Sequence, residues 1–206
     1  MLNSLYYPQA SQFLSRIDSD WAQLINNVGV CTLANETEPE LSPYQALVQA
    51  VCYQQLHGKA ADAIFAKFKN HFSGFPSSEQ LITAKFDDLR NCGLSGRKIE
   101  TIQGIANAAI SGFVPSREQA AEMSNDALIS QLFTLKGIGQ WTVEMMLIFT
   151  LGRLDVLPVN DLAVVAGYAR LKKLDTLPKP KQMAEIGLAW SPYRSIASWY
   201  LWRVAR

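Results

Sequence analysis

Residues 135–142 contain a pair of glycines, Gly137 and Gly139, between two segments whose apolar residues have helical spacing. Glycine lets the backbone turn tightly where a bulky side chain would block it. In such a turn the glycine amides are directed outward, and the hydroxyl of Thr142 and the dipole of the following helix add to the attraction for an anion. This combination suits a phosphate group, although an isolated glycine pair more often marks a plain helix–turn–helix connection.

Asp161 follows this turn at the start of another expected helix, after the largely apolar run at 155–160. Taken alone, an aspartate in this place caps a helix by accepting backbone amides. A carboxylate can also stabilise positive charge that develops on a reacting group, and it can orient an attacking water. Position and residue type therefore leave capping and catalysis both open.

The turn and the carboxylate are expected to be held by helices, because apolar residues recur at spacings of three and four over most of the chain. Alternation typical of strands is nearly absent, so the sequence predicts an all-α fold. Capping boxes begin at Ser42, Ser77 and Ser116 and mark helix starts. Segments 29–42 and 173–182 are expected to be loosely structured. Helices are expected at roughly 8–27, 43–56, 58–70, 78–84, 86–92, 95–111, 116–122, 124–134, 139–151, 160–172 and 191–204.

The composition is that of a globular protein. The 206 residues are 49% hydrophobic and 18% charged, with a formal net charge of +1. They are enough for one well-cored domain or two small lobes without oligomerisation, so a monomer is expected. No apolar stretch reaches membrane-spanning length and the N-terminus does not read as a signal peptide, which predicts a cytoplasmic protein that contacts no membrane. Cys31, Cys52 and Cys92 form no paired motif and are expected to be buried rather than to hold zinc or an iron–sulfur cluster.

The glycine turn resembles the hairpin of the helix-hairpin-helix DNA glycosylases, which typically reads LxGIGxWTA. The matching residues are Leu135, Gly137, Ile138, Gly139, Trp141 and Thr142. The resemblance implies that Gly137, Gly139 and Thr142 hold a DNA phosphate. In this family a structural monovalent cation often sits at the hairpin on main-chain carbonyls. By position, these would be the carbonyls of Phe133, Leu135 and Ile138.

Asp161 lies in a segment that is similar to the family's fPxxDLgv, 20 residues after Trp141. The resemblance implies that this carboxylate is catalytic and stabilises oxocarbenium-like charge as the N-glycosidic bond breaks. Family members that also cut the DNA strand carry a lysine just after the hairpin glycines, which forms a Schiff base with the sugar. Trp141 occupies that position here, so a monofunctional glycosylase without lyase activity is expected. Lys136 precedes the glycines and is expected to face a phosphate.

Residues 51–61 resemble the family segment iixQQlsxkAA, where one side chain fills the gap left by a base that has rotated out of the duplex. Gln55 matches that wedge by position, and Leu56 is the apolar alternative. His57 has no partner at a catalytic spacing and is expected to lie on the surface or face DNA. If the hairpin were not the phosphate clamp, the basic residues near the C-terminus would be the better candidates: Arg194, Arg203 and Arg206.

Residues 189–195 resemble the family segment WxPyRs, and the resemblance places a base pocket at Trp141, Trp190, Tyr53, Gln54 and Met145. Alkylation at purine N3 or N7 makes a base cationic, so aromatic faces attract it and it can leave without protonation by an acid. The aromatic pocket and the missing lysine therefore favour alkylated purines over oxidised or mismatched bases. Trp199 and Trp202, on the last expected helix, are expected to be core residues.

The resemblance spans about residues 43–206 and is to the compact, all-helical DNA-3-methyladenine glycosylase II type. It implies two helical lobes that flank a DNA-binding cleft: a helix-hairpin-helix lobe at 43–155, and a second lobe made of 1–42 plus 156–206. The expected partner is double-stranded DNA with alkylated bases, with no required cofactor and no iron–sulfur cluster. A glycosylase for other damaged or mismatched bases, or a non-catalytic helix-hairpin-helix module, remains the alternative.

Overall fold

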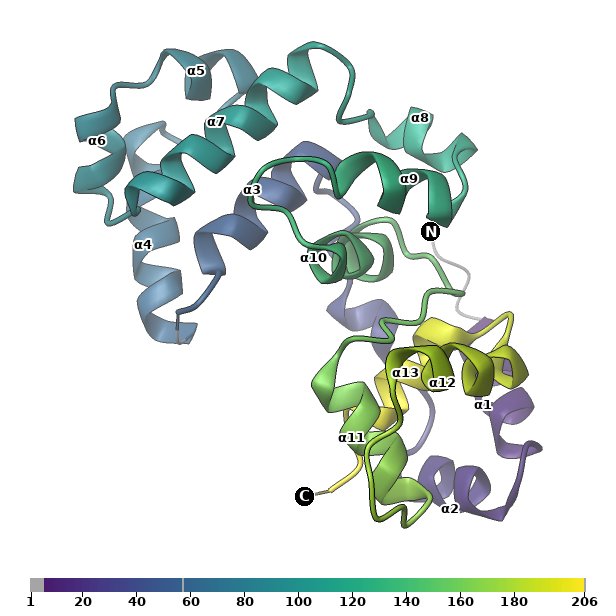
Figure 1. The fold of residues 1–206 in the computed structure, drawn as a ribbon. Coiled ribbons are helices and arrows are strands. Elements are labelled where there is room, and N and C mark those ends of the chain that lie inside the picture. The colour runs from purple at the N-terminus through teal and green to yellow at the C-terminus, as the bar shows by residue number, and fades with distance from the viewer. Residues whose placement is uncertain (1–5, 57, 206) are drawn as a thin grey trace. The chain divides into compact units, whose positions relative to one another are not determined.

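The computed structural model describes residues 6–56 and 58–205, and every regular element in them is helical (Figure 1). This confirms the all-α prediction. The contacts divide the chain into two compact units, of which unit 1 comprises Met1–Glu38 and Leu147–Arg206 and unit 2 comprises Pro39–Met146. The sequence analysis placed the lobe boundaries after residues 42 and 155, whereas the units of the structure meet after residues 38 and 146. The cleft expected between the lobes stays a prediction. The expectations for His57 and Arg206 fall outside the described residues.

Unit 2 is built around α7 (Gly96–Ile110), which packs against α3 (Pro43–Tyr53) and α5 (Ser78–Thr83) (Figure 1). The predicted capping boxes are present at the starts of α3, α5 and α8, because each box uses only residues that are neighbours in sequence. The unit also contains α4 (Gly58–His71), α6 (Phe86–Asn91), α8 (Arg117–Glu122), α9 (Asn125–Leu132) and α10 (Gln140–Met145).

Unit 1 is built around α13 (Arg194–Leu201), in which every residue after Arg194 is buried. α13 packs against α1 (Tyr6–Ser15), α2 (Ser19–Val28) and α11 (Leu162–Leu171). The shorter elements of this part of the chain are η1 (Leu33–Glu36), η2 (Met146–Thr150, whose first residue ends unit 2), α12 (Pro180–Ile186) and η3 (Gly187–Trp190).

Four expected elements differ in the structure. The helix expected at 8–27 is two helices, because the Asp18 carboxylate caps α2 by accepting the amides of Asp20 at 3.0 Å and Trp21 at 3.1 Å. Segment 29–42 contains the short turn η1. Segment 173–182, expected to be loose, includes the start of α12, where Pro180 occupies the first turn and is a helix signal that the sequence analysis missed. The helix expected at 139–151 is α10 followed by a π-helical turn, η2.

No helix in the described part of the chain is long and apolar enough to cross a membrane. The three cysteines are buried, as the sequence predicts, and their thiols are free. Burial raises the pKa of Cys31 and of Cys52 to about 12, and it also raises the pKa of Cys92. These thiols therefore stay protonated near neutral pH and pack as small apolar groups.

Helices α11 and α13 approach each other closely at Gly167. A Cβ on Gly167 would overlap the carbonyl oxygen of Leu201, the last residue of α13. The obstacle is backbone, which cannot rotate away as a flexible side chain could. Glycine at this position therefore sets the end of α13 against the middle of α11.

We expect Gly167→Ala to lower the free energy of unfolding by about 1–3 kcal/mol, because the new methyl group forces two helices apart. Gly104→Ala is the matched control, since Gly104 is an exposed position of α7 and its Cβ would meet no atom within 4 Å. That change should be neutral or stabilising by up to roughly 1 kcal/mol. Urea unfolding of both variants measures the difference, and equal stabilities would show that the crossing is not tight.

Candidate functional site

The hairpin between α9 and α10 is exposed at both glycines. Gly137 has a φ of +83°, which L side chains rarely adopt, and a Cβ there would overlap the side chain of Thr101 on α7. Gly139 precedes α10 with an ordinary φ of −90°, and its Cβ would meet no atom within 4 Å. The turn itself therefore requires glycine at position 137, whereas the space that a side chain of residue 139 would occupy is empty.

The hairpin exposes polar backbone groups. Among the described residues, the amides of Gly137 and Gly139 donate to no backbone carbonyl. The Ile138 amide closes the turn by donating to the Leu135 carbonyl at 3.0 Å. Thr142, whose hydroxyl the sequence analysis assigned to a phosphate, is only 6% exposed. The two glycine amides are thus the groups of this turn that suit an anion best.

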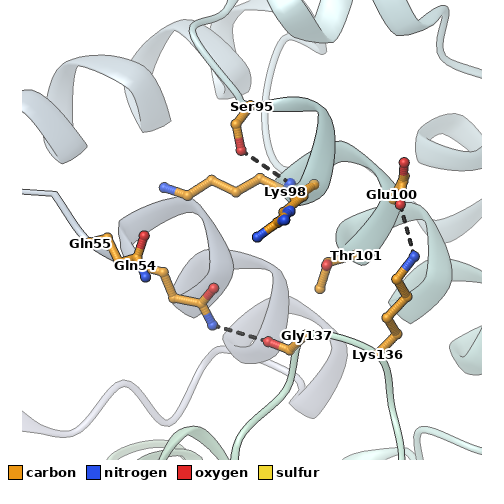
Figure 2. A pocket seen from close by; sticks show the side chains of 9 residues that line it. Gln54, Gln55, Ser95, Lys98, Glu100, Thr101, Lys136 and Gly137 are labelled. Carbon is orange, nitrogen blue, oxygen red and sulfur yellow. Dashed lines mark hydrogen bonds and ion pairs between the residues drawn. The ribbon is translucent and has the colours of Figure 1, made fainter.

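A pocket of about 660 Å³ adjoins the hairpin in unit 2 (Figure 2). Gln54 Nε2 donates to the Gly137 carbonyl at 3.3 Å, and Lys136 Nζ forms an ion pair with Glu100 at 3.0 Å. The pocket thus brings together Gln54, Gln55 and Gly137, which the sequence predicted as site residues, with cationic side chains of α7 that it did not single out. The residues that line it are Gln54, Gln55, Ser95, Arg97, Lys98, Glu100, Thr101, Lys136 and Gly137.

The segment that follows α3 is held from α7. Lys98 Nζ donates to the Cys52 carbonyl in the last turn of α3 at 2.9 Å, and burial lowers the pKa of Lys98. Gln55 then turns the chain with a φ of +57°, and both Gln55 and Leu56 are exposed. Either side chain can therefore reach a partner outside the protein, and the choice of wedge between them stays open.

Three predicted pocket residues of unit 2 have different degrees of exposure. Trp141 is 51% exposed, while Tyr53 and Met145 are half-buried. The Tyr53 hydroxyl donates to Asp62 Oδ1 at 2.8 Å, and its ring meets the edge of Phe65 at a centroid distance of 5.5 Å. Of the two aromatic residues, Trp141 therefore offers the more exposed ring to an incoming ligand.

Trp190, also predicted as a pocket wall, lies in the core of unit 1. It is 1% exposed, with its ring centroid 5.4 Å from that of Trp21 and 5.5 Å from that of Tyr168. A ligand could stack on Trp190 only if this packing opened. The residues next to Trp190 in the sequence do not indicate that it is buried, because Trp21, which packs against it, lies far away in the sequence.

Asp161 is the N-cap of α11 and is 9% exposed. Its Oδ1 atom accepts the amides of Ala163 at 2.8 Å and Val164 at 2.9 Å, so the capping role that the residue type suggested is confirmed. Leu162, the next residue, is 76% exposed. The structure thus fixes one oxygen of a largely buried carboxylate, next in sequence to an exposed residue.

Trp202 is a neighbour of Asp161 that the sequence analysis missed. It was expected to be a core residue like Trp199, which is 2% exposed, but Trp202 is only half-buried. Its indole Nε1 donates to Asp161 Oδ1 at 3.3 Å. A tryptophan whose ring is partly buried at a helix end needs an acceptor for its indole N–H. That need is the one general reason to expect a polar partner for Trp202.

Arg194 and Ser195 fasten the chain segment that leads to Asp161. Arg194 forms an ion pair with Asp155 at 2.7 Å, and Ser195 Oγ accepts the amide of Val156 at 3.0 Å. Burial alone would raise the pKa of Asp155, but hydrogen bonds from Arg194 and Ser191 outweigh it and hold this pKa below its ordinary value. The second half of the motif at 189–195 therefore positions the backbone ahead of the candidate catalytic residue.

Comparison with known proteins gives a consistent family. The model of the HhH-GPD superfamily of base excision DNA repair proteins matches residues 48–192. The chain is 41% identical over 200 residues to DNA-3-methyladenine glycosylase 1 of Schizosaccharomyces pombe, covering 96% of this chain and 87% of the relative. It is 34% identical to the alkylbase DNA glycosidase-like protein mag2 of the same species, covering 97% and 94%.

Solved structures agree with this likeness. The S. pombe 3-methyladenine DNA glycosylase Mag1, solved in complex with abasic DNA, matches with a TM-score of 0.84 and 42% identity over 95% of each chain. A DNA-3-methyladenine glycosidase from Bacillus halodurans matches with a TM-score of 0.84 and 33% identity over 94% of this chain and 88% of that one. The chain therefore belongs to the HhH-GPD superfamily of base excision DNA repair proteins, as the sequence motifs predicted.

The two hairpin glycines should respond differently to substitution. We expect Gly137→Ala to lower the free energy of unfolding by about 1–3 kcal/mol, because alanine is strained at positive φ and meets Thr101. Gly139→Ala should change it by less than about 0.5 kcal/mol, because its methyl group enters open space. Thermal unfolding monitored by circular dichroism measures both, and a larger loss for Gly139→Ala would contradict this geometry.

Proposed function

We propose that this protein excises alkylated purines, of the 3-methyladenine and 7-methylguanine type, from double-stranded DNA and so begins base excision repair. The observation that carries the proposal is the likeness, across nearly the whole chain, to relatives named for 3-methyladenine excision. The capped Asp161 and the exposed hairpin amides supply the groups that such a reaction needs. Cytoplasmic location and a monomeric state belong to the same proposal.

The hairpin is proposed to hold the DNA backbone. The exposed amides of Gly137 and Gly139 would donate hydrogen bonds to a phosphate, and the open space at Gly139 would admit it. The Gln54 side chain, which bonds the Gly137 carbonyl, steadies the turn from the neighbouring segment. Phosphate contacts of this kind set the register of the protein on DNA without reading its sequence.

A monovalent cation at the hairpin stays part of the proposal. Its ligands would be the main-chain carbonyls of Phe133, Leu135 and Ile138, and carbonyl oxygens suit a hard cation. The Leu135 carbonyl accepts the Ile138 amide at 3.0 Å, and its second lone pair can still coordinate. A bound cation would supply positive potential next to the phosphate.

Base release requires the damaged nucleotide to leave the stack, which costs roughly a few kcal/mol. Gln55 or Leu56, both exposed at the turn after α3, would fill the gap. A cationic alkylated base gains about 1–2 kcal/mol from a desolvated aromatic face, and Trp141 is the exposed candidate for that role. Tyr53, Gln54, Met145 and the buried Trp190 remain proposed as further contacts of the base.

Asp161 is proposed to act on the sugar. As the N-glycosidic bond breaks, positive charge develops on the deoxyribose, and a carboxylate fixed by the N-terminus of α11 stabilises it without reorganising. The same carboxylate can orient the water that adds to the sugar. An alkylated base needs no proton to depart, so this chemistry requires only one carboxylate.

Changing Asp161 to Asn tests the proposal. Asparagine is also a good N-cap and keeps an oxygen for the amides of Ala163 and Val164, so the fold should be retained. We expect base release to fall by at least about 100-fold, as when a preorganised electrostatic group is lost. The measurement is chromatography of the bases freed from methylated duplex DNA by protein free of host glycosylases.

Two outcomes would contradict the proposed function. Full activity of Asp161→Asn on methylated DNA would remove the catalytic assignment. A wild-type protein that binds abasic-site DNA but frees no methylated base would favour the alternatives, a glycosylase for other lesions or a non-catalytic DNA-binding module. Duplexes that carry an oxidised or a mismatched base separate these two.

The product is expected to be an intact strand with an abasic site, because Trp141 stands where a lyase would carry its nucleophilic lysine. Sodium borohydride should therefore trap no covalent adduct between the protein and its DNA product, and the strand should break only after alkali or heat. Denaturing gels with and without borohydride make the measurement, and an efficiently trapped adduct would mean that another amine attacks the sugar.

A further inference from the structure

The pocket beside the hairpin carries more positive than negative charge. Arg97, Lys98 and Lys136 are the cationic side chains of its lining, and Glu100 is the one carboxylate. Lys136 Nζ lies 3.0 Å from Glu100, so these two charges balance each other. In the described part of the chain, Arg97 and Lys98 form no ion pair. Two positive charges of the pocket therefore have no counter-charge among the described residues.

Lys98 is the more constrained of these two cations. It is half-buried, and its Nζ donates to the Cys52 carbonyl at 2.9 Å. Figure 2 shows its side chain extended toward the side of the pocket where Gln55 lies. An ammonium group has three N–H donors, so two remain for a ligand. Burial lowers the pKa of Lys98, and an anion placed beside the ammonium would offset this loss of hydration.

Arg97 is the more accessible cation. It is the second residue of α7, it is exposed, and its side chain makes no hydrogen bond to the residues that the structure describes. A guanidinium offers five N–H donors in a planar fork that matches the oxygens of a phosphate. The rest of the lining is mostly polar, which suits a hydrated anion better than an apolar group. These other residues are Gln54, Gln55, Ser95, Thr101 and Gly137.

We propose that this pocket is a second phosphate site, in which Arg97 and Lys98 hold a DNA backbone phosphate other than the one at the hairpin glycines. The inference rests on the proposed function for the presence of DNA, and on none of its catalytic assignments. The volume of about 660 Å³ is large enough for a phosphodiester with part of its sugars. Because Gln55 lines the same pocket, a phosphate held there would fix the backbone next to the gap that the wedge fills.

The hairpin and the pocket would hold their phosphates by different means. Gly137 presents its carbonyl oxygen to Gln54 Nε2, and a carbonyl oxygen repels an anion. The two cations of α7, rather than the hairpin backbone, would therefore be the groups that bind a phosphate in the pocket. Side-chain cations that neutralise a phosphate release its condensed counterions, so this site should contribute to the salt dependence of DNA binding.

The rival occupant is the base left without a partner when the damaged nucleotide rotates out. An arginine can also donate to the edge of a base. The charge of the pocket favours the phosphate, because a phosphate is anionic and an unmodified base is neutral. The two occupants also predict different behaviour. Binding to a phosphate is independent of the opposite base, whereas binding to a base edge depends on which base is present.

The first experiment compares Arg97→Gln with Lys67→Gln. Arg97 is the residue to change, because it is exposed and its removal breaks no described hydrogen bond, whereas Lys98 supports the end of α3. Lys67 is the matched control, since it is an exposed cation of α4 in the same unit but does not line the pocket. Binding is measured to duplexes that carry a tetrahydrofuran abasic site opposite each of the four bases, at several salt concentrations.

We expect Arg97→Gln to weaken binding roughly 10-fold, equally for all four opposite bases, and to reduce the slope of log K against log salt by about one. Arg97→Lys should restore the slope. Lys67→Gln should stay within about twofold of the parent, because salt screens a charge that does not contact the DNA. Equal losses in the two glutamine variants would reduce the effect to net charge and overturn the inference. A loss confined to one opposite base would assign the pocket to the base instead.

The second experiment locates the phosphate. Single phosphates of the same duplex are replaced, one at a time on either strand, by neutral methylphosphonates. At one position the replacement should weaken binding of the parent roughly 10-fold and of Arg97→Gln by less than about twofold, since the two changes remove the same contact. Gly139→Ala, whose methyl group enters the space in front of the hairpin, should lose sensitivity at a different position. Coupling of both variants to one phosphate, or of Arg97→Gln to none, overturns the inference.

Both experiments measure binding alone, so their outcome is separable from that of the proposed function. If Arg97→Gln couples to its own phosphate but the parent releases no methylated base, the proposed function fails and the second phosphate site stands. If the parent releases methylated bases and Arg97→Gln binds the abasic duplex as tightly as the parent, the inference alone fails. Circular dichroism of each variant confirms that the fold is retained.

Discussion

The contact between two backbones at Gly167 and Leu201 is the constraint on which the arrangement of unit 1 depends. Because glycine has no Cβ, α13 can lie directly against α11, and the end of one helix is set relative to the other. Beyond this crossing, Arg170 of α11 donates to the Val204 carbonyl at 3.3 Å. On the other side of it, Trp202 reaches Asp161. The candidate catalytic carboxylate therefore owes its cap to the first turn of α11 and its contact with Trp202 to the packing of α13 against α11.

Unit 2 positions its candidate DNA contacts with polar groups instead. α7 supports both of them, since Thr101 occupies the space beside Gly137 while Lys98 holds the last turn of α3. The hydrogen bond from Gln54 to the Gly137 carbonyl then links the proposed wedge segment to the proposed phosphate turn. A wedge and a phosphate clamp with common support keep a fixed spacing, which is what recognition of a distorted duplex requires.

The parts that the sequence predicted well are those set by neighbouring residues. Capping boxes, the glycine turn and the cap at Asp161 each involve residues within a few positions of one another, and the structure contains them. What local patterns could not indicate depends on distant contacts. The packing of Trp190, a proposed pocket residue, against Trp21 and Tyr168 is one example. Trp202 was assigned to the core, although its acceptor lies on another helix. Periodicity marks such residues as apolar without indicating their partners.

Burial of the three cysteines protects a protein that would work while DNA is under chemical attack. Methylating agents react with soft nucleophiles, and the thiolate is the reactive form of cysteine. Cys31, Cys52 and Cys92 are all buried, and pKa values of about 12 keep Cys31 and Cys52 protonated. The three thiols are therefore poor targets for the electrophiles that create the proposed substrates.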